Sequence, residues 1–352
     1  MRNDRTFEKI LTVGPDISGL GGISAVLRTY ADIVPGFTFL PSNSRRGTLR
    51  GAFVLLGTML RLPLYRLRGY RIIHAQGASG KSFTRKRMLM GWARHLGYRT
   101  IFHNHGGGFR EFAAKTGKDR ISAILGRCDA VAVLTPAWKE YFEKELGCRH
   151  VAVLPNPVIP PARPVTRPAL RPGEPLKAVF LGKICRDKGV WDLLEAVARR
   201  RDELDGRLEI VMAGNGEAET LRRRIADLGI SSIVKYAGGV FGDEKDALLR
   251  ASRLMILPSY VEGVPITLLE AGVYGMASLT TPVGGIPDLI TDGENGTLVA
   301  PGDVDAFADA LVRYAANPSL AVEQGRQAPA RVAPHLPEAL REALSNLYNA
   351  IK

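Results

Sequence analysis

The stretch from Pro258 to Pro301 constrains the fold more than any other part of the chain. It follows four apolar residues, 254–257, a run that is typical of a strand buried in a parallel sheet. Pro265 then suits the first turn of a helix, where its missing N–H leaves no hydrogen bond unmade. A helix that begins at the carboxyl end of a parallel strand directs free backbone N–H groups and the positive end of its dipole outward. The stretch therefore predicts an α/β unit that binds phosphate or ligand oxygens around residues 263–266.

Two glutamates and a second turn extend this predicted site. Glu262 and Glu270 are eight residues apart, about two helical turns, so both lie on one side of the helix. Carboxylates accept hydrogen bonds from a ligand rich in hydroxyl groups. A tight turn over 281–287 follows an apolar strand, 276–279, and is expected to bring more backbone to the same edge. These features together indicate a pocket for a hydroxyl-rich, anionic ligand.

The order of these residues resembles the signature of family 4 glycosyltransferases. The shared pattern is Glu262-Gly263-x-Pro265-x4-Glu270, then Pro282-x-Gly284-Gly285, then Gly293-x-Asn295-Gly296. Two glutamates at this spacing are common by chance, whereas the ordered set over about forty residues is specific. Members of that family are retaining enzymes that use nucleotide sugars. The resemblance therefore implies an α/β fold of the GT-B class, with two Rossmann-like domains facing each other across a cleft, and neither a cofactor nor a required metal.

Length and linker composition also indicate two domains. The chain has 352 residues, more than one typical hydrophobic core accommodates, and strands alternate with helices in both halves. A segment rich in Pro and Arg, without apolar periodicity, predicts a linker. We expect an N-terminal acceptor-binding Rossmann-like domain over 1–160, a linker over 161–175 and a C-terminal nucleotide-sugar domain over 176–335. By resemblance, a last helix over 336–352 returns to the first domain.

In the C-terminal half, the resemblance assigns donor contacts to loops that follow strands. Lys183 and Lys188 stand where the family has an arginine and a lysine that neutralise the leaving nucleoside diphosphate. Lys183 keeps the charge but lacks the bidentate fork of arginine, and two solvated surface lysines are the alternative interpretation. Val240 lies where the family holds the nucleotide base. The full expected donor set is Gly21, Gly22, Lys183, Lys188, Gly214, Asn215, Val240, Glu262, Gly263, Val264, Pro265 and Glu270.

The N-terminal half contributes a glycine loop and a histidine. Gly21 and Gly22 lie between an expected strand and helix, where glycines let backbone amides approach phosphate; a simple tight turn is the alternative. His105 follows the expected strand 99–103 and precedes three glycines, so it is placed at a ligand-binding edge. In the resembled family this histidine touches the donor sugar. We expect it to position the reactants without forming a covalent intermediate. The expected catalytic residues are His105, Glu262 and Lys188.

Metal and disulfide sites are not expected. Asp303-Val304-Asp305 opens a helix and is interpreted as an N-cap followed by a first-turn acid. Glu111 is the one acid near the histidines 74, 103 and 105 in the sequence, so a metal site is not predicted there. Cys128, Cys148 and Cys185 are odd in number and widely spaced, which favours reduced thiols in a cytosolic protein.

All of the net positive charge lies in one segment. The net charge is +13, residues 41–100 contain 13 lysines and arginines, and no acid occurs between Asp32 and Glu111. One face is therefore expected to meet an anion. The segment 50–70 is interpreted as an amphipathic helix whose basic face rests on a membrane; the alternative is that its apolar side packs on the sheet and its arginines are solvated. The expected acceptor and membrane residues are Arg61, Arg66, Arg68, Lys81, Arg85, Lys86 and Arg87.

These observations lead to one hypothesis and two alternatives. The hypothesis is a retaining hexosyltransferase that moves a sugar from a nucleotide sugar to a saccharide acceptor linked to polyprenyl diphosphate, in bacterial cell-surface polysaccharide synthesis. The apolar run 51–60 is half a membrane span and no signal peptide is recognised, so we expect a cytoplasmic protein, peripheral on the inner face of the cell membrane. The alternatives are a non-hydrolysing sugar-nucleotide 2-epimerase of the same fold and a basic anion- or nucleic-acid-binding protein. Few aromatic residues accompany the basic segment, so a nucleic-acid partner is not expected.

Overall fold

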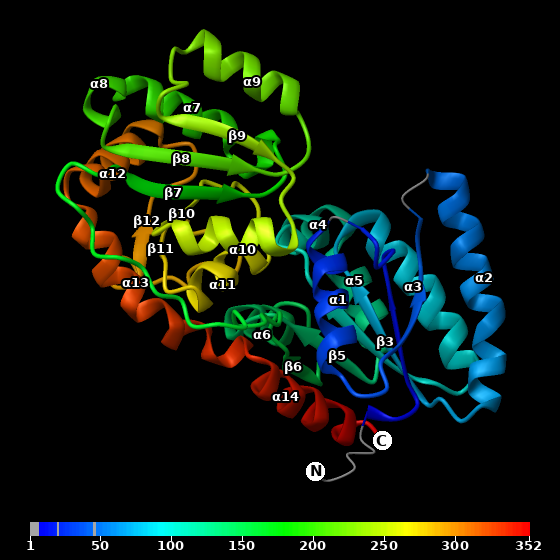
Figure 1. Ribbon diagram of the computed structural model, residues 1–352. Helices are drawn as coiled ribbons and strands as arrows, with labels where there is room; N and C mark the ends of the chain where they lie inside the picture. The colour runs from blue at the N-terminus through cyan, green and yellow to red at the C-terminus, as the bar shows by residue number, and fades with distance from the viewer. Residues whose placement is uncertain (1–6, 20, 45–46) are drawn as a thin grey trace. The chain divides into compact units, whose positions relative to one another are not determined.

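The computed structural model describes residues 7–19, 21–44 and 47–352, which form two compact units (Figure 1). Unit 1 is Met1–Val158 together with Pro334–Lys352, and unit 2 is Ile159–Ala333. Each unit is built on a six-stranded sheet whose paired strands run parallel. Arg45 and Arg46 of the basic segment lie outside the described residues.

The sheet of unit 1 has the strand order β2-β1-β3-β4-β5-β6. Its strands are β1 (Ile10–Gly14), β2 (Thr38–Pro41), β3 (Ile72–Gly77), β4 (Arg99–Asn104), β5 (Ala130–Val133) and β6 (Val151–Val153). Because β1 lies between β2 and β3, the strand order reverses at the β1–β3 boundary, and open α/β sheets bind ligands outside the carboxyl ends of strands at such a switch point. Val13 pairs with Ala75 there, so the carboxyl ends of β1 at Gly14 and of β3 at Gly77 lie at the same edge.

Helices cover both faces of this sheet. The helices of unit 1 are α1 (Gly22–Ile33), α2 (Thr48–Leu67), α3 (Gly80–His95), α4 (Phe109–Thr116), α5 (Lys118–Leu125), α6 (Pro136–Lys144) and α14 (Pro337–Ala350). Side chains of β3 alternate between the faces: Ile73 and Ala75 enter the core cluster that contains α3, while His74 hydrogen-bonds through Nδ1 to the Tyr348 hydroxyl of α14 at 2.8 Å. The last helix of the chain is thus part of unit 1.

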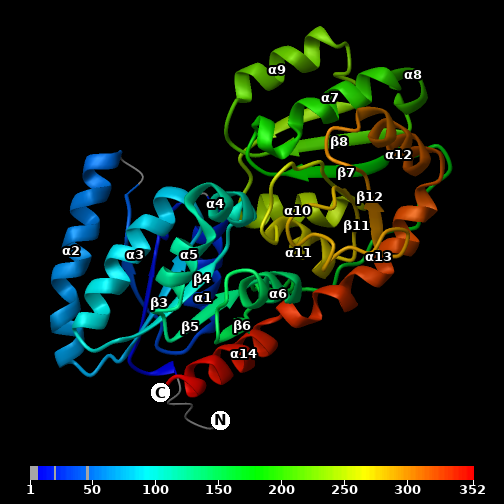
Figure 2. The same ribbon diagram turned by 180° about the vertical axis from the view of Figure 1, so that it is seen from behind.

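The helix α2 lies on the outside of α3 in both views (Figures 1 and 2). Pro63 lies inside α2 and has no N–H to donate to the carbonyl of Met59, and the indole Nε1 of Trp92 on α3 donates to that carbonyl instead, at 3.0 Å. The Tyr98 hydroxyl likewise donates to the Leu62 carbonyl at 2.7 Å. These bonds fix the orientation of α2 on the unit.

The sheet of unit 2 has the order β12-β11-β10-β7-β8-β9, the doubly wound Rossmann arrangement. Its strands are β7 (Leu176–Leu181), β8 (Leu208–Ala213), β9 (Val234–Gly238), β10 (Leu254–Leu257), β11 (Ala277–Thr280) and β12 (Gly296–Leu298). Its helices are α7 (Val190–Arg199), α8 (Arg201–Leu204), α9 (Ala218–Asp227), α10 (Gly242–Ala251), α11 (Ile266–Val273), α12 (Val304–Ala316) and α13 (Pro318–Val332), with short 3₁₀ turns at Arg186–Lys188 and Ala333–His335. The switch point of this sheet lies between β7 and β10.

The segment interpreted as a linker makes hydrogen bonds to helices of unit 2 and their ends. The Arg167 guanidinium donates to the carbonyls of Leu249, Arg250 and Tyr274 at 2.8–3.1 Å. Arg250 returns hydrogen bonds to the carbonyls of Arg163 and Pro164. Backbone carbonyls therefore hold the middle of this segment, although it has neither helix nor strand.

The described helices also bear on the membrane question. No helix in the described part of the chain is both long enough and apolar enough to cross a bilayer.

Candidate functional site

Loops at the carboxyl edge of the unit 2 sheet pack backbone against backbone. Gly189 has φ +65°, and a Cβ there would lie 1.9 Å from the carbonyl oxygen of Pro258. A Cβ on Gly214 would lie 1.7 Å from the carbonyl oxygen of Gly182. Only glycine fits at either position, so the loops after β7, β8 and β10 are held in direct contact. This close packing brings their functional side chains to one edge.

The second turn of the signature joins the same edge, as the sequence predicts. Gly284 has φ +60°, and a Cβ there would lie 1.9 Å from the carbonyl oxygen of Glu262. The Gly285 N–H donates to the Gly263 carbonyl at 2.6 Å. The turn after β11 therefore rests on the loop that carries Glu262 and precedes α11.

Glu262 and Lys188 are in direct contact although 74 residues separate them. Lys188 Nζ donates to Glu262 Oε1, and the Ser259 hydroxyl donates to the same oxygen at 2.7 Å. Glu262 is buried, whereas a quarter of the Lys188 side chain stays exposed. The pair presents an ammonium group to solvent at the switch point, where it can meet a phosphate oxygen. Ser259 was not predicted, although a hydroxyl three residues before Glu262 is a signal within the motif.

Glu270 on α11 has one paired oxygen and one free oxygen. Its Oε1 accepts from Lys245 Nζ of α10. Its Oε2 is buried and has no hydrogen-bond partner among the described residues. A buried carboxylate oxygen without a donor is costly, and a ligand hydroxyl would satisfy it. Sequence reasoning missed Lys245, because α10 carries no motif.

The other expected donor residues lie on neighbouring loops. The Asn215 side chain packs against Gly239, and the Ile184 N–H donates to the Asn215 carbonyl at 2.8 Å, so the loops after β7, β8 and β9 adjoin. Val240 is half-buried beside them. Lys183 is exposed, and within the described part of the chain no ion pair or hydrogen bond joins it to Lys188 or the two glutamates. The structure thus joins Glu262 to Lys188 and gives Glu270 a different lysine.

In unit 1, His105 lies at the carboxyl edge between two amides. Its Nδ1 is 3.1 Å from Asn156 Oδ1, and its Nε2 is 2.6 Å from Gln76 Oε1. Burial lowers the pKa of His105 to about 4 and that of His74 to about 3, so both rings are neutral at pH 7. The His103 ring lies between them, with centroid distances of 4.1 Å to His105 and 5.3 Å to His74.

The neutral state of His105 fixes the roles of these amides. A neutral imidazole has one N–H, so it cannot donate to two amide oxygens. Gln76 Nε2 has no hydrogen-bond partner within the described residues. Exchanging the oxygen and the nitrogen of this amide lets Nε2 of Gln76 donate to Nε2 of His105, which satisfies both groups. Nδ1 then donates to Asn156 Oδ1. With both nitrogens engaged, His105 is suited to positioning a ligand and not to acting as a nucleophile.

The glycines at the start of α1 leave open space. Gly21 is the N-cap of α1 and has no capping side chain. A Cβ on Gly21 or Gly22 would meet nothing within 4 Å among the described residues. Packing therefore does not demand glycine here, and the free backbone N–H groups of the first turn are accessible to a ligand.

The residues expected to form a basic surface differ in how far they are exposed. Arg61, Arg68, Lys81 and Arg87 are exposed. Arg66 instead donates through Nε to the Leu96 carbonyl at 3.2 Å and holds the end of α2 in place. Lys86 is buried at 1% exposure, so this residue is not part of a surface that contacts a membrane.

The outward face of α2 is apolar, which differs from the expected basic face. Large apolar side chains along it are 48–87% exposed and recur every three or four residues, namely Leu49, Phe53, Leu56, Leu60, Leu64 and Leu67. Leu55 and Leu62 on the opposite side are buried. The helix is apolar on two sides, and periodicity alone did not reveal that one of them faces solvent.

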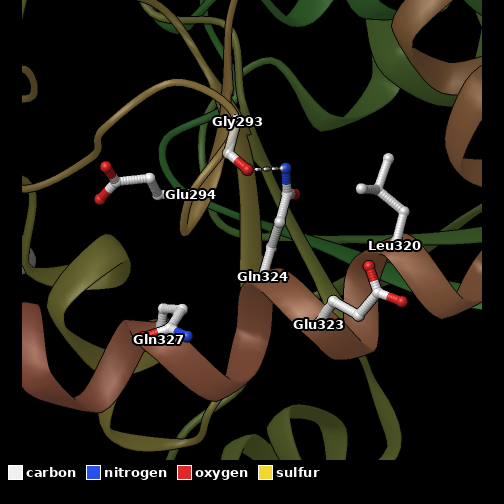
Figure 3. A pocket seen from close by; sticks show the side chains of 6 residues that line it. All are labelled: Gly293, Glu294, Leu320, Glu323, Gln324 and Gln327. Atoms are coloured by element: carbon white, nitrogen blue, oxygen red, sulfur yellow. Dashed lines mark hydrogen bonds between the residues drawn. The ribbon is translucent and has the colours of Figure 1, made fainter.

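A hollow of about 420 Å³ lies elsewhere in unit 2, against α13 (Figure 3). Gly293, Glu294, Leu320, Glu323, Gln324 and Gln327 line it, and Gln324 Nε2 donates to the Gly293 carbonyl at 3.3 Å. Its two carboxylates would repel a diphosphate. The adjoining Asn295 of the signature closes a turn, accepting from the Thr291 N–H and donating to the Leu289 carbonyl. This part of the signature therefore has a structural role.

The Asp-x-Asp sequence behaves as predicted. Asp303 caps α12 by accepting from the Ala306 N–H at 3.0 Å, and Asp305 pairs with Arg199. No cluster of His, Cys, Asp and Glu suited to a metal ion occurs in residues 7–19, 21–44 and 47–352.

Comparison with known proteins relates unit 2 to glycosyl transferases. Residues 164–331, nearly all of unit 2, match the family model of group 1 glycosyl transferases. The chain is 32% identical over 179 residues to D-inositol 3-phosphate glycosyltransferase of Corynebacterium jeikeium, covering 49% of this chain and 43% of that protein. It is 30% identical over 173 residues to the GDP-mannose-dependent alpha-(1-6)-phosphatidylinositol monomannoside mannosyltransferase of Mycobacterium tuberculosis, covering 47% and 45%. The chain thus matches less than half the length of these curated relatives.

A solved structure extends the likeness to the whole fold. HepE of Anabaena, in complex with UDP and glucose, superimposes with a TM-score of 0.71 at 17% identity, covering 95% of this chain and 97% of that one. At this identity the likeness establishes the fold, which is GT-B. Within this fold, residues 164–331 match the group 1 glycosyl transferases.

Proposed function

We propose that this protein is a retaining glycosyltransferase that binds a nucleotide sugar at the carboxyl edge of the unit 2 sheet. The observation that carries the proposal is the buried Oε2 of Glu270 on α11, which has no hydrogen-bond partner among the described residues, together with the Glu262–Lys188 pair in the loops of the same sheet. The ribose hydroxyls of a donor would satisfy Glu270. The names of the mannosyltransferase relative and of the HepE complex, which mention GDP-mannose and UDP, support a nucleotide sugar as the donor class.

The side chains at this edge suit the charge changes of glycosyl transfer. As the glycosidic bond breaks, negative charge grows on the diphosphate, and a preorganised ammonium stabilises it. Lys188, held by Glu262 and partly exposed, would supply that charge. Glu262 would accept from sugar hydroxyls. Attack from the face of the leaving group would retain the anomeric configuration without a carboxylate nucleophile, and His105 of unit 1 would orient the reactants.

A thermal-shift panel of UDP-, GDP- and ADP-sugars tests the donor site. A bound donor raises the unfolding midpoint by mass action, and we expect one base to do so. Glu270→Ala should abolish the shift, whereas Glu294→Ala in the acidic hollow should leave it unchanged. A normal shift in Glu270→Ala would overturn the ribose assignment, and incubation of the donor without acceptor would reveal a 2-epimerase instead.

The acceptor is proposed to be a saccharide linked to polyprenyl diphosphate, at the cytoplasmic face of a bacterial membrane and in cell-surface polysaccharide synthesis. The exposed apolar stripe of α2 supports this proposal, because such a face inserts into the headgroup region of a bilayer. Arg61 and Arg68 are exposed on the same helix and its end, where they would attract anionic lipid. The mannosyltransferase relative is named for a lipid acceptor, phosphatidylinositol monomannoside.

Liposome flotation tests the membrane assignment. The wild-type chain should float with anionic vesicles, and Phe53→Ser combined with Leu60→Ser should reduce the bound fraction at least fivefold. Phe241→Ser removes an exposed aromatic residue from unit 2 and should have no effect. Equal flotation of all three proteins, or indifference to lipid charge and salt, would contradict the assignment.

A further inference from the structure

Lys86 on α3 is a buried lysine that has no counter-ion among the described residues. Its Nζ donates to the Ser42 hydroxyl at 2.5 Å, and that hydroxyl donates to the Gly14 carbonyl at 2.8 Å. Among the described residues no carboxylate forms an ion pair with Lys86, and the sequence has no acid between Asp32 and Glu111. Burying an ammonium group costs free energy unless a paired charge compensates it.

The position of Lys86 is the switch point of the unit 1 sheet. Gly14 ends β1, Ser42 follows β2, and Gly77 ends β3. A Cβ on Gly77 would lie 3.3 Å from Lys86 Cγ, so the lysine stem rests against the end of β3. The carboxyl ends of three strands therefore surround Lys86, at the place where open α/β sheets bind ligands.

Among the groups around Lys86, Arg85 adds positive charge and the others are neutral. Arg85 precedes it on α3, is half-buried, and has a buried Nε without a partner in the described part of the chain. Burial, and then Arg85, lower the pKa of Lys86 to about 7. The strands β1, β2 and β3 present Ser42 Oγ and the backbone of Gly14 and Gly77, and β4 is followed by His105, whose pKa Lys86 lowers.

We propose that this switch point binds a phosphate-class anion on the acceptor, with Lys86 as the floor of the site and Arg85 and Ser42 beside it. The proposal rests on the proposed transferase function and names a chemical group of its acceptor. The anion supplies the counter-charge that Lys86 lacks and receives hydrogen bonds from Arg85. Lys86 becomes fully protonated when the anion binds, so binding takes up a proton at pH 8.

Two acceptors carry this chemistry. One is the diphosphate of a polyprenyl-linked saccharide, and the other is the phosphate of a soluble sugar phosphate. Both present tetrahedral phosphate oxygens, so both fit the same cationic floor. Competition with a simple anion distinguishes them.

Isothermal titration of the full chain with sulfate tests the site, since sulfate does not titrate between pH 6 and 9. Heats in buffers of different ionisation enthalpy give the number of protons taken up. We expect close to one proton per sulfate at pH 8, and an affinity that falls as pH rises from 6.5 to 9. Lys86→Met should abolish the uptake and weaken binding at least tenfold. Lys115→Met removes the same charge from an exposed position of α4 and should change affinity less than twofold.

Further variants separate this site from the donor site. Lys188→Met in unit 2 should leave sulfate binding to unit 1 intact. Ser42→Ala and Arg85→Gln should each weaken sulfate binding, and these two variants test the site if Lys86→Met fails to fold. Farnesyl diphosphate or glucose 1-phosphate should then displace sulfate, and the stronger competitor identifies the source. Binding without proton uptake, loss of binding in Lys188→Met with retention in Lys86→Met, or no displacement by either compound would overturn the proposal. None of these readouts requires sugar transfer, so their failure leaves the donor assignment standing.

Discussion

The two sheets share a parallel, doubly wound architecture, but charges are paired at the carboxyl edge of one and unpaired at that of the other. In unit 2 each functional carboxylate has its own lysine, Glu262 with Lys188 and Glu270 with Lys245. In unit 1 the edge gathers Lys86 and Arg85 without an ion pair to either among the described residues. A paired edge suits a ligand with both hydroxyl and phosphate groups, whereas an unpaired cationic edge suits an anion alone. The same strand topology therefore carries two edges that suit different ligands.

The largest expected effect tests how the unit 2 edge is built. Gly284→Ala places a Cβ 1.9 Å from the Glu262 carbonyl oxygen at a positive φ, so the turn must move. We expect a loss of about 2–4 kcal/mol in the free energy of unfolding, together with loss of the donor thermal shift. Urea denaturation measures the first quantity. Gly21→Ala in unit 1, where a Cβ meets open space, should change stability by less than about 0.5 kcal/mol. Equal effects would contradict the contrast between a packed edge and an open one.

The next effect concerns the unit 2 ion pair. A double-mutant cycle with Glu262→Gln and Lys188→Met should give a coupling free energy of about 1–3 kcal/mol, because the carboxylate is buried. The exposed helix pair Glu140 and Lys144 should give a coupling several times smaller. Thermal denaturation of the four proteins in each cycle measures both values, and a negligible coupling for Glu262 and Lys188 would remove the basis for a preorganised ammonium.

Lys86→Met should act in the opposite direction from Lys188→Met. Folding lowers the pKa of Lys86 from 10.5 to about 7, so the unfolded chain holds the proton more tightly between these values. The free-energy cost of burying the protonated Lys86 in the folded state is fully present below about pH 7 and disappears as pH rises through 10.5. Lys86→Met should therefore raise stability by about 1–2 kcal/mol at pH 6, with a gain that shrinks toward pH 10. A destabilised variant whose deficit is independent of pH would show that Lys86 is uncharged or already paired.

The smallest expected effect tests the attachment of α14 behind the unit 1 edge. Tyr348→Phe removes the hydrogen bond to His74 Nδ1 and should cost about 1 kcal/mol. Denaturant unfolding measures this loss. Tyr314→Phe in unit 2 removes a buried hydroxyl bonded to Thr297 and Gln324 and is the matched control. A neutral Tyr348→Phe variant alongside a destabilised Tyr314→Phe variant would show that the α14 contact contributes little.

Regular elements were predictable where one local signal dominated. The strand Leu254–Leu257 has the predicted bounds and the strand Arg99–Asn104 is one residue longer than predicted, because a run of apolar residues marks each. The helix α13 was missed: Pro329 lies inside it, and its polar composition gives a weak periodic signal. The strand β12 was missed because three residues are too few for a pattern.

Sequence reasoning proposed the residues of the site but not their contacts. The resemblance singled out Glu262, Glu270 and Lys188, but their pairing depends on loops after four strands whose packing requires glycine at 189, 214 and 284. Lys245 became visible only when α10 and α11 were placed together. The basic segment predicted an anion-binding face, yet the fold buries Lys86 and exposes leucines on α2, because a helix with two apolar sides can bury either.

The central claim is that Glu270 holds the ribose of a nucleotide donor, and one titration tests it most directly. Isothermal titration compares the nucleoside diphosphate selected by the thermal-shift panel with its 2′,3′-dideoxy analogue, on the wild-type chain and on Glu270→Ala. The account predicts that removing the hydroxyls weakens binding to the wild type at least tenfold and leaves binding to Glu270→Ala unchanged. The same loss in both proteins would contradict it.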